Sequence, residues 1–355
     1  MAKITLDRVR HSYTENPESA DDWALKQLDV VWSDGGAYAL LGPSGCGKTT
    51  LLNVISGLLQ PSEGRVLFDD RDVTGVPSDR RDIAQVFQFP VVYDTMSVYD
   101  NLAFPLRNRR VPEDQVKTRV HEIASMLELE GVLSNRASGL TADGKQKISL
   151  GRGLVRSDVN VIMFDEPLTV IDPHLKWLLR SKLKELHQEV RATMIYVTHD
   201  QTEALTFADK VVVMHDGQVV QIGTPVELFE KPKHTFVGHF IGSPGMNLLP
   251  CEIVDGFPSF LGHRLETAEA VKVPAGAERM EIGVRPEFVS FADEGLPVDI
   301  IKVDDIGRHR IVEVHHKSQA IKLVTPEDTP IPEDKGHLVF ERDKTNVYAD
   351  GWILS

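Results

Sequence analysis

Residues 42–50 read Gly42-Pro43-Ser44-Gly45-Cys46-Gly47-Lys48-Thr49-Thr50. The run matches the pattern Gly-x-x-x-x-Gly-Lys-Thr, in which backbone N–H groups surround a phosphate. Residues 37–41, just before it, are apolar and short enough for a buried strand, and apolar residues recur at helical spacing just after it. Because the motif needs a strand, a glycine-rich loop and a helix in this order, the stretch predicts an α/β fold of the P-loop type.

The same stretch, called the phosphate loop below, predicts the ligand. Its glycines allow successive amides to turn toward a phosphate, and the N-terminus of the next helix adds roughly half a positive charge. Lys48 is spaced to reach the β- and γ-phosphates, and the hydroxyl of Thr49 is spaced to bind Mg²⁺. We therefore expect a nucleoside triphosphate and Mg²⁺ at this loop.

Length and charge narrow the class of protein. A chain of 355 residues has room for two domains. The formal net charge of −14 argues against nucleic acid as the main partner, because contacts with nucleic-acid phosphates need positive charge. Two cysteines, Cys46 and Cys251, fit a reducing compartment better than a disulfide framework. The sequence has no signal-peptide core and no run of about 18 apolar residues, so we expect any membrane connection to go through another chain.

Short apolar runs predict strands in the first part of the chain, and one central stretch differs from them. Residues 91–157 predict a helical insert, in which Ser97 is a suitable N-cap and Pro105 is expected to end the first helix. The continuous apolar run at residues 161–164 predicts a strand buried on both faces. Asp172-Pro173 predicts the start of a long helix, with Asp as N-cap and Pro at the first position.

The last third of the chain changes from helices to strands. Asp216-Gly217, between two valine-rich runs, predicts a β-hairpin. From about residue 245 helical periodicity disappears, and short alternating segments predict a small all-β domain. We expect a first domain at residues 1–240, which includes a helical subdomain at about 91–157, and a second domain at residues 241–355.

Three more polar residues follow predicted strands. Asp165 and Glu166 end the apolar run at residues 161–164, and His199 ends another run at residues 195–198. Ligands of doubly wound α/β folds collect at the carboxyl ends of strands. We therefore expect Asp165 to hold Mg²⁺ beside Lys48, Glu166 to polarise an attacking water as general base, and His199 to donate a hydrogen bond to the γ-phosphate.

Several motifs resemble the ATP-binding cassette (ABC) family. They are Asp165-Glu166-Pro167-Leu168, Asp172, Val197-Thr198-His199-Asp200-Gln201-Thr202-Glu203-Ala204 and, in the tail, Gly283-Val284-Arg285-Pro286-Glu287. The chain most resembles the ATPase subunits of bacterial importers for carbohydrates and polyols, the maltose-type group, and within that group those of glycerol importers. The resemblance covers nearly the whole chain. It implies an enzyme that binds ATP and Mg²⁺ and couples ATP hydrolysis to import.

The resemblance also implies further site residues and partners. Gln88 is similar to the residue that contacts Mg²⁺ and water and couples to the membrane partner, and residues 89–105 to the groove that receives that partner. Tyr13 resembles the aromatic residue that stacks on adenine, with an ordinary strand-end tyrosine as the alternative. The family context implies a C-terminal oligomer-binding-fold-like (TOBE) regulatory domain, a second ATPase chain, two transmembrane permease subunits and a periplasmic substrate-binding protein. It places the chain peripherally on the cytoplasmic face of the inner membrane.

The family signature, Leu-Ser-Gly-Gly-Gln, is altered in this chain. In the family it opens a helix that contacts ATP bound to the opposite subunit, and the corresponding stretch here is Leu140-Thr141-Ala142-Asp143-Gly144-Lys145-Gln146. A register that starts at Ser138-Gly139 would require an insertion in that helix. Thr141 keeps the hydroxyl and the N-cap, and Asp172 keeps the carboxylate of the loop that faces the partner. Asp143, by contrast, brings a like charge toward a triphosphate, which repels it.

Two pairings follow from this signature. If the chain pairs with itself, both sites combine an intact Lys48 and Glu166 half with an altered signature. If it pairs with a different ATPase chain, its intact half faces a normal signature, which better explains why every catalytic residue is kept.

Two other classes of protein remain as alternatives. One is a soluble cassette ATPase that acts on nucleic acid or ribosomes, which the acidic charge disfavours, and the other is a weakly hydrolytic regulatory subunit.

Overall fold

The computed structural model describes residues 2–190 and 192–354. The chain divides into two compact units, Met1–Pro225 and Val226–Ser355. This division differs from the predicted boundary after residue 240, because helix α8 (Thr235–Phe240) and nearly all of α7 (Pro225–Glu230) lie in the second unit. Within the described residues, no helix combines the length and the apolar character needed to cross a membrane.

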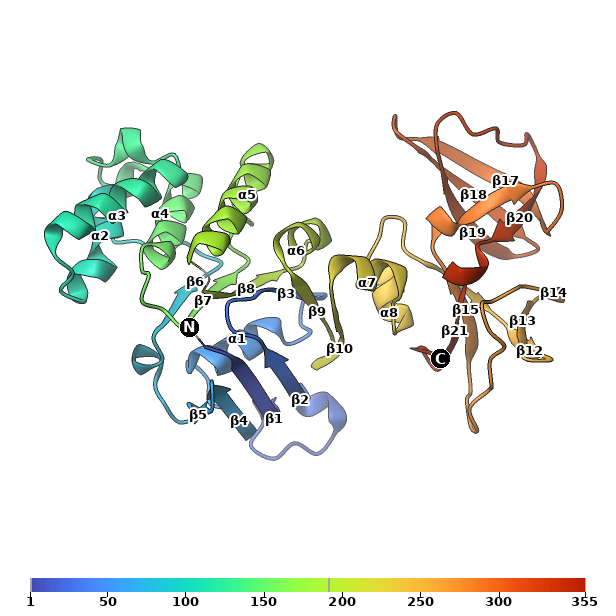
Figure 1. Cartoon of the computed structure of the whole chain (residues 1–355), viewed down its shortest axis with the longest axis horizontal. Coiled ribbons are helices and arrows are strands. Elements are labelled where there is room, and N and C mark those ends of the chain that lie inside the picture. Colours follow the sequence, from blue (N-terminus) through green and yellow to red (C-terminus); the bar gives the residue numbers. More distant parts are fainter. Residues whose placement is uncertain (1, 191, 355) are drawn as a thin grey trace. The chain divides into compact units, whose positions relative to one another are not determined.

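The first unit is built around a six-stranded sheet with the order β10-β9-β3-β8-β7-β6 (Figure 1). All neighbouring pairs are parallel except β9 and β10, which form the predicted hairpin. The carboxyl ends of the parallel strands therefore meet at one edge. The bounds are β3 Ala37–Leu41, β6 Ile83–Val86, β7 Val161–Asp165, β8 Thr193–Thr198, β9 Lys210–His215 and β10 Gln218–Gly223.

A second, antiparallel sheet of the first unit has the order β2-β1-β4-β5. Its alternating sequence puts every second side chain into the core, as in β1, where Ile4, Leu6 and Val9 are buried. The same core includes residues of α1 and of the six-stranded sheet, so α1 is packed into one continuous apolar cluster with both sheets. The bounds are β1 Ile4–Ser12, β2 Trp23–Trp32, β4 Glu63–Phe68 and β5 Arg71–Asp72.

Helix α1 (Lys48–Ser56) follows β3 directly after the phosphate loop, which confirms the predicted strand, loop and helix. Gly47 is its N-cap with φ 98°, and Gly57 its C-cap with φ 77°. Side chains rarely adopt these left-handed conformations, so glycine permits the helix to start and stop at these residues. The N-terminus of α1 consequently points into the loop that ends β3.

The predicted helical insert is confirmed as α2 (Val98–Asn108), α3 (Glu113–Met126) and α4 (Ala142–Leu154), which lie together in Figure 1. Ser97 caps α2 by accepting a hydrogen bond from the N–H of Asp100. The prediction that Pro105 ends this helix is wrong, because α2 continues through it to Asn108. Proline removes one helical hydrogen bond, but the buried Leu102 and Leu106 hold the same face of α2 in the core on both sides of it.

Helix α5 (Pro173–Val190) begins where the sequence predicts, and the carboxylate of Asp172 accepts a hydrogen bond of 2.9 Å from the N–H of His174. Helix α6 (Gln201–Phe207) follows β8 and is capped by Asp200. Because β8 ends at Thr198 and α6 begins at Gln201, only two residues connect them. His199 is one of these two residues, so its backbone is fixed from both sides.

The second unit contains three antiparallel sheets, which confirms the predicted all-β region. Their orders are β11-β15-β21-β22, β12-β13-β14 and β16-β20-β17-β18-β19. One apolar cluster, which includes Leu249, Phe260, Ile282 and Val312, contains residues of all three sheets. The bounds are β11 Asn247–Pro250, β12 Glu252–Val254, β13 Phe257–Phe260, β14 His263–Arg264, β15 Met280–Val284, β16 Val289–Ala292, β17 Leu296–Asp305, β18 Arg310–His316, β19 Gln319–Thr325, β20 Lys335–Phe340, β21 Asn346–Ala349 and β22 Trp352–Ile353.

Arg285 ties the two helices of the second unit to this β region. Its guanidinium is buried and donates to four backbone carbonyls, those of Leu228, Phe229, Gly238 and Ile241. Burial lowers the pKa of Arg285 to about 10. Since these carbonyls lie at the carboxyl ends of α7 and α8, one side chain satisfies acceptors that both helices leave open there.

Candidate active site

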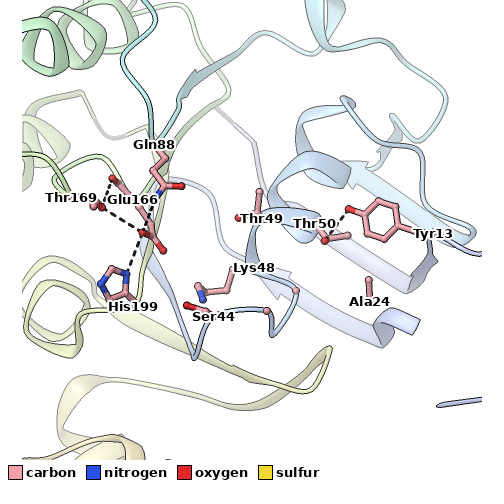
Figure 2. Close-up of a pocket in the computed structure, with 12 residues that line it drawn as sticks. Tyr13, Ala24, Ser44, Lys48, Thr49, Thr50, Gln88, Glu166, Thr169 and His199 are labelled. Carbon is pink, nitrogen blue, oxygen red and sulfur yellow. Dashed lines mark hydrogen bonds and ion pairs between the residues drawn. The ribbon is translucent and has the colours of Figure 1, made fainter. Parts of the chain in front are cut away.

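Most of the predicted site residues line one cavity of about 570 Å³ at the carboxyl edge of the six-stranded sheet, whereas Gly42, Pro43, Cys46 and Asp165 are not part of its lining (Figure 2). The cavity brings together the phosphate loop and residues that come from distant parts of the sequence. Its lining consists of Tyr13, Ala24, Ser44, Gly45, Gly47, Lys48, Thr49, Thr50, Gln88, Glu166, Thr169 and His199. Besides Glu166, Gln88 and His199, seven of the lining residues were predicted from the sequence to belong to the site. All of them line one space, which is large enough for a nucleotide.

Lys48 is the cation of the phosphate loop. Its Nζ donates to the carbonyl of Gly42 at 2.8 Å and to that of Pro43 at 2.9 Å. It also lies 3.8 Å from the sulfur of Cys46, whose thiol pKa is raised by burial. Gly42 has no room for a side chain, because a Cβ there would lie 2.3 Å from the carbonyl oxygen of Met214. In this structure the side chain of Lys48 thus binds carbonyl oxygens of its own loop.

Thr49 and Asp165 form a pair of oxygen ligands beside that lysine. The hydroxyl of Thr49 lies 3.5 Å from Oδ1 of Asp165, which is the last residue of β7. Asp165 is buried, and burial raises the pKa of its carboxyl, with a further contribution from the charge of Glu166. The Thr49 hydroxyl and Lys48 counteract this rise in pKa. An anionic Asp165 needs a nearby cation, and a hydroxyl beside a carboxylate is a pair of ligands that suits Mg²⁺.

Glu166 is the carboxylate on which the remaining polar groups converge (Figure 2). Its Oε2 lies 3.2 Å from Nδ1 of His199 and 3.4 Å from Nε2 of Gln88. The hydroxyl of Thr169 lies 3.4 Å from the same oxygen and donates to the Glu166 carbonyl at 3.1 Å. Glu166 has φ 46°, a left-handed conformation that side chains seldom adopt, and its N–H donates to the carbonyl of Val197. Strained residues of this kind cluster at functional sites.

Thr169 and Ala24 line the cavity, although the sequence analysis assigned neither to the site. For Thr169 the signal was present, because it follows Glu166 by three residues in the loop after a predicted strand. For Ala24 there was none, since an alanine on a strand has no functional group. Ala24 forms part of the cavity wall, and this role becomes apparent only in the folded chain.

Tyr13 borders the cavity on the side away from Glu166. Its side chain is 68% exposed, and its hydroxyl lies 3.1 Å from that of Thr50. The ring of His11 meets it edge-on with the ring centroids 4.8 Å apart. An exposed ring at the mouth of a cavity is free to contact a planar base, so its position is compatible with the role that the resemblance implies for Tyr13.

Thr141 and Asp172 do not line the cavity. Thr141 is the N-cap of α4, and its hydroxyl accepts from the N–H of Gly144 at 3.2 Å. Asp172 precedes α5, as described above. Their predicted roles do not involve this cavity: Thr141 belongs to the signature expected to contact ATP of an opposite subunit, and Asp172 to the loop expected to face the partner.

The structure changes the electrostatic argument about Asp143. Its Oδ2 lies 3.8 Å from Nζ of Lys147, one helical turn along α4, and Lys147 also lies 3.8 Å from Glu128. Lys147 is buried, which strengthens its interaction with both carboxylates. Asp143 is therefore not a lone charge, and its ion pair with Lys147 reduces the repulsion that it can exert on a triphosphate.

Sheet order, phosphate loop and cavity together define a P-loop nucleotide-binding protein. The family model described as ABC transporter matches residues 25–169. A curated relative, the sn-glycerol-3-phosphate import ATP-binding protein UgpC of Bordetella avium, is 38% identical over 315 residues, which are 88% of this chain and 85% of the relative. The protein of the same name from Brucella abortus is 40% identical over 295 residues, 83% of this chain and 80% of the relative. The chain belongs to the ABC transporter ATPase family.

Solved structures agree with this assignment. The chain resembles cbiO1 of Clostridium perfringens, part of the ABC transporter complex cbiONQ, with a TM-score of 0.57 and 29% identity over 64% of this chain and 90% of that one. It also resembles the ATP-binding cassette MJ0796 in a dimeric post-hydrolysis state bound to ADP and phosphate, with a TM-score of 0.56 and 27% identity over 62% of this chain and 98% of that one. The chain is accordingly an ATP-binding ATPase.

Proposed function

We propose that this chain is the ATP-hydrolysing subunit of a bacterial importer for a carbohydrate or polyol of the glycerol class. The observation that carries the proposal is the cavity in which Lys48, Glu166 and His199 converge at the edge of the sheet. The curated relatives described above are import proteins for sn-glycerol-3-phosphate, which supports a three-carbon polyol skeleton. ATP bound between paired subunits would close them, hydrolysis at this cavity would let them reopen, and this cycle would drive uptake.

The residues divide the chemistry among them. The phosphate loop holds the phosphates, and Lys48 exchanges its loop carbonyls for the β- and γ-phosphate oxygens. Glu166 accepts a proton from the attacking water, and Gln88 orients that water. His199 donates to the γ-phosphate from its place 3.2 Å from Glu166. Tyr13 stacks on adenine at the other side of the cavity.

Mg²⁺ fits the ligands that the site offers. Thr49 and Asp165 present neighbouring oxygens, and the side-chain oxygen of Gln88 is a further ligand. Mg²⁺ typically binds a few such protein oxygens together with the phosphates of the substrate. The burial that raises the Asp165 pKa would be offset by a bound cation. When bound, the ion neutralises charge on the transferred phosphoryl group.

The membrane partners would meet the first unit beside Gln88. Phe89, Val91 and Tyr93 are exposed there, at 75%, 49% and 40%, on the segment that leads from the cavity to α2. An exposed row of large apolar side chains is typical of an interaction surface. It supports docking of one transmembrane permease subunit on this chain, and the family resemblance adds a second permease subunit and a periplasmic substrate-binding protein to the proposed importer. The chain would then lie peripherally on the cytoplasmic face of the membrane.

The second ATPase chain is best supplied by a different protein. Thr141 and Asp172 do not line the chain's own cavity, so we expect a complete site to need the signature of a second chain. Asp143 in this chain's signature is an anion near a triphosphate even after pairing with Lys147. A partner with an ordinary signature would give the intact cavity described here a normal second half. The C-terminal β unit would serve as the regulatory domain of the pair.

Asp143→Asn tests this reasoning, because it removes the charge while keeping the shape of the side chain. We expect the ATPase rate of the isolated chain, which can only pair with itself, to rise about threefold to tenfold, equivalent to about 0.7–1.4 kcal/mol. Phosphate release is the measurement. Glu128→Gln is the matched control, since it removes the other partner of Lys147 away from the signature. Equal rates for Asp143→Asn and the unsubstituted chain at saturating ATP would refute the charge argument.

Uptake by cells distinguishes the substrates. Deleting the gene for this chain should abolish energy-dependent uptake of radiolabelled glycerol or of sn-glycerol-3-phosphate, and competition between the two identifies which is transported. Complementation by the unsubstituted chain restores uptake, whereas Lys48→Ala does not. If neither compound is lost from the deletion strain, the glycerol class is wrong, although the ATPase assignment is unaffected.

A weakly hydrolytic regulatory subunit is the second candidate, and the altered signature with Asp143 favours it. This function predicts ATP binding with negligible phosphate release even in the assembled complex. The proposed function predicts release that depends on Glu166 of this chain. A phosphate-release assay on the complex therefore separates the two.

A further inference from the structure

Glu203 is a buried carboxylate outside the cavity, with a side chain that is 5% exposed. It lies in the first turn of α6, four residues after His199. Its Oε2 accepts hydrogen bonds from the hydroxyl of Tyr196 at 3.0 Å and from that of Thr198 at 2.9 Å. A buried carboxylate is costly unless it is satisfied, and these contacts satisfy one of its two oxygens.

The other oxygen of Glu203 faces helix α5. Oε1 lies 3.6 Å from Nζ of Lys176 and 3.9 Å from Nη1 of Arg180. Packing alone does not require this charge, because Ala204 and Phe207 are fully buried and already hold α6 in the core. A polar group that is retained where an apolar contact would suffice needs another explanation. One carboxylate here connects β8, α5 and α6.

The hydroxyl of Thr198 carries this connection to the cavity. It donates to Glu203 and accepts from the backbone N–H of Asp200 at 3.0 Å. His199 lies between Thr198 and Asp200, so the backbone on both sides of it is fixed. The imidazole itself is 57% exposed, so burial does not fix its position. The position of the backbone therefore decides whether Nδ1 reaches Glu166.

We propose that Glu203 is a positioning residue for ATP hydrolysis, which holds His199 in place through the hydroxyl of Thr198. The inference deepens the function proposed above and rests on the role of His199 given there. Because Lys176 and Arg180 belong to the helix that starts after Asp172, the place of His199 is also tied to the loop that faces the partner chain.

Thr198→Val is the decisive variant, because Glu203→Ala would leave buried donors without an acceptor and lower stability. Valine keeps the volume but removes the hydroxyl that links Glu203 to Asp200. We expect kcat for ATP hydrolysis by the complex, purified through a tag on this chain, to fall about tenfold, with KM for ATP changed by less than about twofold. Thr198→Ser should restore kcat to within about twofold. Thr206→Val is the matched control, since its hydroxyl donates to a helix carbonyl instead.

A double-mutant cycle separates this inference from the role of His199. If Thr198 acts through His199, adding Thr198→Val to His199→Ala lowers kcat by less than about twofold further. A full tenfold additional loss would overturn the positioning role while leaving the role of His199 intact. If His199→Ala keeps the unsubstituted rate, the role of His199 fails and the inference fails with it. A loss of kcat in Thr198→Val that Thr198→Ser does not rescue also overturns it.

Discussion

ATP hydrolysis is expected to fall at least about 100-fold when Glu166 is replaced by glutamine, because a general base contributes roughly 10²–10⁴ to such reactions. Glutamine keeps the length of the side chain and an oxygen for His199 and Thr169, but it cannot accept a proton from water. ATP affinity should change by less than about threefold, since no contact to the phosphate loop is lost. Phosphate release under saturating ATP and equilibrium binding of a fluorescent ATP analogue measure the two quantities.

Thr169→Ser is the matched control for Glu166→Gln. It leaves a hydroxyl beside Oε2 of Glu166 and should keep the rate within about twofold of the unsubstituted complex. Substantial turnover in Glu166→Gln, with ATP binding intact, would show that another group removes the proton. In that case Glu166 would be an orienting residue and the assignment of the general base would have to change.

Lys48→Ala should weaken ATP binding about 100-fold, which corresponds to about 2.7 kcal/mol. Among the described residues that line the cavity, Lys48 is the one lysine or arginine, so its loss leaves the phosphates without a permanently charged side-chain donor. It also leaves the carbonyls of Gly42 and Pro43 without the donor that closes the loop. Titration with a fluorescent ATP analogue measures the affinity.

Lys302→Ala is the control for Lys48→Ala, because Lys302 forms an exposed ion pair with Asp304 in the second unit, away from the cavity. It should leave the dissociation constant for ATP within about twofold. Thermal unfolding of both variants shows whether the chain stays folded. Unchanged ATP affinity in a folded Lys48→Ala variant would contradict the proposed contact with the β- and γ-phosphates.

The parts of the site that sequence alone predicts are those set by short-range pattern. The phosphate loop, Asp165-Glu166 and His199 each follow an apolar run, and parallel strands bring such ends to one edge. Contacts across the sequence were not predictable. Gln88 comes within 3.4 Å of Glu166, and Glu128 within 3.8 Å of Lys147, only because the fold brings distant segments together.

Local propensity also misled at one helix. Proline usually ends a helix, yet α2 runs through Pro105 because its buried leucines are held by the rest of the first unit. The predicted change from helices to strands near residue 245 was confirmed, but the boundary of the compact units lies at Pro225. Periodicity identifies what kind of element a segment forms, and it does not reveal which core that element joins.

The four hydrogen bonds of Arg285 have a consequence for the preparation of fragments of this chain. A recombinant C-terminal piece that starts at residue 241 would lack three of the four carbonyls that Arg285 contacts, those of Leu228, Phe229 and Gly238. Its buried guanidinium would then have to reach water, and the carboxyl end of β15, which directly precedes Arg285, would be disturbed. A piece that starts ahead of α7 keeps every acceptor. A fragment designed to express the β region separately should therefore begin before α7 and α8 and not after them.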